Sequence, residues 1–176
     1  VGPVAPGGFA LWNLGFRPFY LLATSFGTVS VLLWVAQVSG LLPSAYLQGA
    51  IWHGHEMLFG YTTAVIAGFL LTAVRAWTNQ PTPSGAPLMA LAALWVCGRL
   101  LVLTPFALAS ALVNAAFPVA IAVAIGIPIL RSRNVRNYFF VGLLALMAAL
   151  IVAVHVALRE LFSISPQLGL QLALDV

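Results

Sequence analysis

The chain has 176 residues, of which 62% are hydrophobic and only 6% are charged. A soluble domain typically carries about 25% charged residues, so this composition excludes a water-soluble domain and indicates an integral membrane protein. All seven cationic residues are arginine, and the absence of lysine excludes Schiff-base chemistry within this segment. The net charge of +4 does not indicate nucleic-acid binding, because the arginines are spread over the ends of the predicted helices.

The apolar runs are long enough for membrane-spanning helices and lack the alternation of barrel strands. We therefore predict an all-α, polytopic membrane protein, with a single transmembrane domain over residues 1–176. Five spans are expected, at about 19–42, 46–74, 88–103, 106–130 and 138–158, with the start of a sixth after Pro166. The second run exceeds the roughly 20 residues needed to span, so this helix should tilt or begin irregularly.

Cysteine and tryptophan in these runs are expected to have structural roles. Cys97 is the only cysteine, which excludes an internal disulfide and a thiolate metal cluster. We expect it to be a small buried residue. Four tryptophans are expected to face lipid or the membrane interface, namely Trp34, Trp52, Trp77 and Trp95.

The arginines predict the orientation of the spans. Five of them fall on one side of the predicted membrane, at Arg17, Arg75, Arg131, Arg133 and Arg136. The opposite side carries only Arg159, and Arg99 lies within a span. Because cytoplasmic loops carry the excess of positive charge, we predict a cytoplasmic N-terminus.

This orientation predicts that the polar residues of the spans share the outer leaflet. All three histidines, one acid and the intramembrane arginine lie near the outer ends of their helices: His53, His55, Glu56, Arg99 and His155. Polar side chains inside a membrane are costly unless they are paired or bind something. The outer leaflet is therefore the expected location of a functional site.

The stretch 52–60 is the densest polar segment of the chain, and helical geometry limits what it can do. His53 and His55 are two residues apart, about 200° around a regular helix, so they should face different partners. Glu56 follows His53 by three and should share its face. Small residues continue that stripe at a spacing typical of close helix packing, at Gly60, Ala64 and Gly68.

Histidine at these positions is suited to metal chemistry. Imidazole is a common axial ligand of haem iron and a good copper ligand. His155 together with His53 or His55 would supply one ligand from each of two helices. Arg99 could pair with a haem propionate. Glu56 would act as an acid beside the ligands or at a copper site.

Two alternatives stay open at this point. The histidines could be merely hydrogen-bonded in a structural or assembly subunit of a larger membrane complex, with Arg99 extended outward to the headgroups. A proton-coupled transporter that uses Glu56 is a weaker alternative, because no second acid lies further inward to continue a proton relay.

The sequence resembles the NnrS family of bacterial inner-membrane proteins. The matching stretches are 14–22, 52–60 and 66–74, with Trp77–Thr78, Pro81, Gly98–Arg99 and 136–138. The resemblance implies a multi-pass protein of the inner membrane that contains haem, expected to be b-type, and copper, and that is linked to nitric oxide metabolism.

Family members are longer than this chain, so we expect residues 1–176 to be the N-terminal half of a longer protein. The expected partners are the lipid bilayer and either other membrane subunits or the C-terminal half. Our leading hypothesis is a haem-binding protein, with copper as a further cofactor, in nitric oxide response or electron transfer. Its site would lie near the periplasmic face.

Overall fold

The protein is a bundle of helices, as its composition predicts. The computed structural model describes residues 10–42, 47 and 49–164, and this part of the chain contains helices and no strands. The elements are η1 (Ala10–Asn13), α1 (Phe16–Val38), α2 (Gly49–His55), η2 (Glu56–Tyr61), α3 (Thr62–Thr78), α4 (Ala86–Val102), α5 (Ala107–Arg131), η3 (Val135–Asn137) and α6 (Tyr138–Ile164).

Four helical segments in the described residues are long and apolar enough to cross a bilayer. These are α1, the continuous run α2–η2–α3 of 30 residues, α5, and the segment Val135–Leu158 that includes most of α6. The span predicted at 88–103 is present as α4, but it has only 17 residues. That length is at the lower limit for crossing, so a fifth span stays a prediction. The predicted start of a sixth helix lies outside the described residues.

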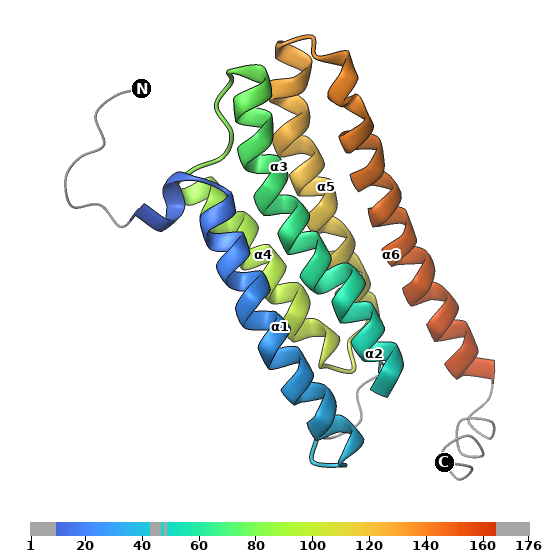
Figure 1. Cartoon of the computed structure of the whole chain (residues 1–176). Helices are drawn as coiled ribbons and strands as arrows, with labels where there is room; N and C mark the ends of the chain where they lie inside the picture. Colours follow the sequence, from blue (N-terminus) through green and yellow to red (C-terminus); the bar gives the residue numbers. More distant parts are fainter. Residues whose placement is uncertain (1–9, 43–46, 48, 165–176) are drawn as a thin grey trace.

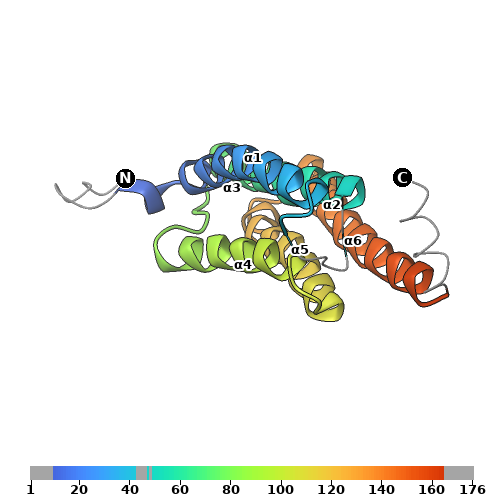
Figure 2. The ribbon, with the colours of Figure 1, turned by 90° about the horizontal axis from the view of Figure 1, so that it is seen from below.

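The helices run alternately up and down around α5 (Figure 1). Seen from below, α1 and α2–η2–α3 form one layer, while α4 and α5 lie beneath it and α6 lies beside α5 (Figure 2). The hydrophobic core fills the space between α1, α3, α4 and α5, with fully buried side chains that include Phe19, Leu71, Ile121 and Ile125. The outer faces keep exposed leucine, valine and phenylalanine, which suits contact with lipid.

This alternation brings the polar ends of several helices together. The start of α2–η2–α3, the last turns of α4 and the lower part of α6 all lie at the bottom of Figure 1. The C-terminal end of α3 and the turn between α5 and α6 lie at the top, and they carry Arg75, Arg131, Arg133 and Arg136. The predicted grouping of the histidines apart from these arginines is therefore present in the fold.

Small residues let the helices approach closely where the sequence predicts packing. A Cβ atom at Gly68 would lie 2.9 Å from the ring of Tyr20 and 3.2 Å from Phe19 on α1. Ala64, one turn earlier, is completely buried. The stripe thus packs mainly within this chain.

Three side chains differ from their predicted environments. Trp52 and Trp95 are buried in the bundle and do not face lipid. For Trp95 the reason is a buried acceptor, because its indole Nε1 donates a hydrogen bond to the Gly60 carbonyl at 3.0 Å. Cys97 is exposed, since two residues along a helix turn it away from the face that buries Trp95.

Candidate functional site

A π-helix, η2, begins at the acidic residue of the polar stretch. The Thr62 backbone N–H bonds to the Met57 carbonyl five residues earlier, which is the π-helical spacing. The Thr63 hydroxyl donates to the Phe59 carbonyl at 2.6 Å, and Trp95 donates to Gly60. The predicted irregularity of the second span therefore lies at 56–61, and side chains satisfy the carbonyls that the wide turn leaves available. Such π-turns are frequent at functional sites.

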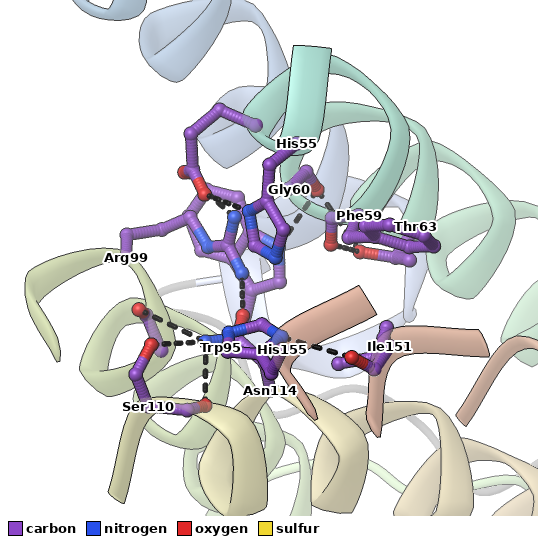
Figure 3. Close-up of polar contacts among 12 residues, drawn as sticks. His55, Phe59, Gly60, Thr63, Trp95, Arg99, Ser110, Asn114, Ile151 and His155 are labelled. Carbon is purple, nitrogen blue, oxygen red and sulfur yellow. Dashed lines mark hydrogen bonds and ion pairs between the residues drawn. The ribbon is translucent and has the colours of Figure 1, made fainter. Parts of the chain in front are cut away.

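Glu56 is the centre of a buried polar cluster, and its partners His55 and Arg99 are labelled in Figure 3. Its side chain is 0% exposed. One carboxylate oxygen accepts a hydrogen bond from His55 Nδ1 at 2.8 Å, and the other accepts from Arg99 Nη1 at 2.6 Å. Glu56 and His53 contact different helices: the carboxylate of Glu56 reaches His55 and Arg99 of α4, whereas the ring of His53 stacks on α1.

Arg99 is held inside the bundle and does not extend to the headgroups. It is 7% exposed, and its Nη2 donates to the Asn114 side-chain oxygen. The Asn114 amide nitrogen donates in turn to the Ser110 carbonyl at 2.9 Å. The guanidinium also lies over the Trp95 ring, 5.6 Å from its centroid. The positive charge is therefore balanced by a carboxylate, an amide and an aromatic face.

His55 and His155 meet beside this cluster (Figure 3). Both are buried, and their ring centroids lie 5.0 Å apart in an edge-to-face arrangement. His155 Nδ1 lies 2.9 Å from the Ile151 carbonyl. Because the Nδ1 atom of each ring faces an acceptor, the proton of the neutral ring belongs on Nδ1 and the lone pair on Nε2. The Nε2 atom of His55 is buried and has no hydrogen-bond partner among the described residues.

His53 lies apart from the cluster. Its ring stacks on Trp34 of α1, with centroids 4.4 Å apart and planes inclined by 13°. The two histidines of the polar stretch therefore face different partners, as their spacing predicts. Of the five predicted site residues, the structure brings together His55, Glu56, Arg99 and His155.

The family of the chain follows from a comparison with known protein families. The sequence matches the family described as NnrS protein over residues 10–176. The chain belongs to the NnrS family. The match covers the whole polar cluster, and membership suggests a membrane protein related to nitric oxide. No curated protein and no solved structure matches the chain.

Two residues of the NnrS cluster escaped the sequence prediction. The side-chain oxygen of Asn114 accepts a hydrogen bond from Arg99, and the Ser110 carbonyl accepts one from the Asn114 amide nitrogen. A signal was available, because Asn114 is the single amide side chain in the apolar helix α5, and an intramembrane amide requires a partner.

The donor set of this NnrS protein is small. Within residues 10–42, 47 and 49–164, no group of three or more histidine, cysteine, aspartate or glutamate side chains is placed to hold a metal ion. The imidazoles that lie together in the cluster are those of His55 and His155. Glu56 is used as the hydrogen-bond acceptor of His55 and as the partner of Arg99.

Asn114→Ala is expected to lower the free energy of unfolding by about 1–3 kcal/mol, the cost of leaving a buried hydrogen-bonding group unsatisfied. The group concerned is Nη2 of Arg99. Denaturant titration of the purified protein in detergent would measure the change. Asn134→Ala, in the turn after α5, removes the same group away from the cluster and should have little effect. Equal stability of the two variants would contradict a structural role for Asn114.

Proposed function

We propose that this NnrS protein binds a redox metal cofactor at His55 and His155 and acts in nitric oxide metabolism or electron transfer. The observation that carries the proposal is the hydrogen bonding of the His55 ring. Its Nδ1 is fixed by a carboxylate while its buried Nε2 lacks a partner among the described residues. Metal-ligating histidines have this arrangement, in which one ring nitrogen is oriented by a carboxylate or carbonyl and the other binds the metal. The Nδ1 atom of His155 lies 2.9 Å from the Ile151 carbonyl, which orients this second ring beside His55.

The ring separation favours copper over a haem held between the two rings. A ligating nitrogen lies about 2 Å from its metal, so two rings on opposite faces of one iron have centroids about 6 Å apart. The observed 5.0 Å is shorter, and it suits a single ion shared by two rings at a bent angle. Imidazole is a good copper ligand.

A b-type haem is the second candidate, supported by the small donor set. The porphyrin supplies four nitrogens of its own, so one imidazole is a sufficient protein ligand. Either His55 or His155 could be that ligand. Both terminal nitrogens of Arg99 already donate to protein acceptors, while its Nε has no hydrogen-bond partner among the described residues.

Copper or haem iron would supply one-electron chemistry and a position at which nitric oxide can bind. The protein's own residues define the surroundings. Glu56 orients the His55 ring through its Nδ1, while Arg99 balances the charge of Glu56. Phe59, whose ring centroid is 5.2 Å from that of His55, helps to exclude water. The arginine distribution supports a periplasmic position in the bacterial inner membrane.

A purely structural or assembly role is the rival function. It leaves the buried Nε2 of His55 unexplained, since buried polar atoms normally have partners. The small-residue stripe of the second span also needs no external partner, because Gly68 already packs against α1.

Metal analysis with an absorption spectrum on the same preparation tests the proposal. His55→Ala and His155→Ala should each lower metal affinity by more than about tenfold, since loss of even an outer-shell partner of a ligand costs about 10–100-fold. His53→Ala is the matched control, because it removes an imidazole from the same stretch but outside the cluster, and it should retain the metal. A Soret band that responds to reduction would identify the cofactor as haem. Copper in the metal analysis without such a band would identify it as a copper ion. Wild-type protein without either metal would overturn the proposal.

A further inference from the structure

A cavity is lined by residues at the opposite end of the bundle, where the turn between α5 and α6 lies at the top of Figure 1. Its volume is about 670 Å³. It is lined by Trp77 at the end of α3, by the turn and η3, and by the first turn of α6; the lining residues are Trp77, Asn134, Arg136, Asn137, Phe139 and Phe140. Aromatic rings, amides and one guanidinium thus border a single hollow.

The aromatic part of this cavity has the character of a membrane interface. Trp77 stacks on Phe140, with centroids 5.5 Å apart and planes inclined by 23°. Trp77 is nevertheless 41% exposed. A partly exposed indole at the end of a span is typical of the headgroup level, where one side of the ring contacts hydrocarbon and the other contacts polar groups.

The charge at this end of the bundle has no carboxylate partner among the residues that the structure describes. Four arginines gather there, at Arg75, Arg131, Arg133 and Arg136. The chain has three acidic residues, Glu56, Glu160 and Asp175. Glu56 is already paired with Arg99 at the other end. Among the described residues, no carboxylate forms an ion pair with any of the four arginines.

We propose that this cavity binds the headgroup of an anionic phospholipid. Arg136 would pair with the phosphate, and the amides of Asn134 and Asn137 would donate hydrogen bonds to phosphate or glycerol oxygens. The rings of Trp77 and Phe140 would contact the upper part of an acyl chain. A basic hollow between spans at the arginine-rich end of a membrane protein is a setting in which anionic headgroups bind. This site is independent of the histidine cluster.

Quenching of Trp77 fluorescence by brominated lipid tests the site directly. The protein is placed in phosphatidylcholine nanodiscs with increasing amounts of brominated phosphatidylglycerol. The chain has five tryptophans, so the Trp77 contribution is taken as the difference in quenching between the wild type and Trp77→Phe. This contribution should saturate at a low fraction of the anionic lipid. Arg136→Gln should raise the half-saturating fraction about tenfold, the effect of losing one direct charge-assisted hydrogen bond to the phosphate.

Arg131→Gln is the matched control, because it removes the same charge from the same end of the bundle but does not line the cavity. It should change the half-saturating fraction by less than Arg136→Gln does. Arg136 is exposed, so its replacement should preserve the fold. Quenching that rises without saturation, or that falls equally in both arginine variants, would overturn the proposal by showing bulk attraction alone. Relief of quenching by inorganic phosphate would instead assign the hollow to a soluble anion and overturn the lipid assignment.

Discussion

Arg99→Met is expected to destabilise the bundle by about 3–5 kcal/mol, the cost of breaking a buried ion pair by removing one partner. The substitution leaves the carboxylate of Glu56 without its cation in a position that is 0% exposed. It also removes the hydrogen bond that the Asn114 side-chain oxygen accepts from Arg99. The free energy of unfolding, measured by denaturant titration in detergent, should show the loss. Leu100→Met, at an exposed neighbouring position on α4, controls for methionine on this helix and should change little.

The double variant Glu56→Gln/Arg99→Met separates the cost of an isolated charge from the value of the pair. Replacing both members of a buried pair is often nearly neutral, so the double variant should be more stable than Arg99→Met alone. The two substitutions should therefore be strongly non-additive, with a coupling energy of about 1–3 kcal/mol. Simple additivity would show that the two side chains do not form the ion pair drawn in Figure 3.

The co-location of the polar residues could be predicted from the sequence because it depends on simple quantities. Hydropathy sets the lengths of the apolar runs, and short connections make successive helices antiparallel. His55, Arg99 and His155 then fall at the same end whatever the details of packing. The different surroundings of His53 and His55 were also predictable, because two residues on a helix are about 200° apart.

The π-helix and the partners of Arg99 depend on contacts between distant parts of the chain. The wide turn at 56–61 is stabilised partly by Trp95, which is 35 residues away from Gly60. Periodicity within one helix carries no information about such a donor. The same limit explains the wrong environment predicted for Trp95. From the sequence alone, a tryptophan on an apolar helix is predicted to face lipid, because a distant hydrogen-bond acceptor such as the Gly60 carbonyl cannot be identified.

The cofactor that we propose depends on a third kind of information, which is the separation of two rings on different helices. Sequence places His55 and His155 at one end of the bundle, but it cannot distinguish a centroid separation of 5.0 Å from one that would admit a porphyrin. That distance follows from the packing of α5 against α6 and of η2 against its neighbours. The choice between copper and haem is therefore a question of helix packing.

Gly60→Ala is expected to destabilise the protein by about 1–3 kcal/mol, the usual cost of overpacking a filled interior. A Cβ at Gly60 would overlap Nη1 of Arg99 and would lie 3.0 Å from the ring of Phe26. The guanidinium cannot move aside cheaply, because it is held by Glu56 and Asn114. Displacing it would also disturb the carboxylate that orients His55. We therefore expect the free energy of unfolding in detergent and the metal content both to be lower than in the wild type.

Gly54→Ala is the matched control, because it makes the same substitution in the same span with open space around the new methyl group. No atom lies within 4 Å of a Cβ built at Gly54. Alanine in a helix is favoured over glycine by about 0.5–1 kcal/mol, so this variant should be slightly more stable than the wild type. The two alanine substitutions are thus expected to have opposite signs. If both stabilised the protein, the close approach of Arg99 to the π-helix would be disproved, and with it the reason for a glycine at position 60.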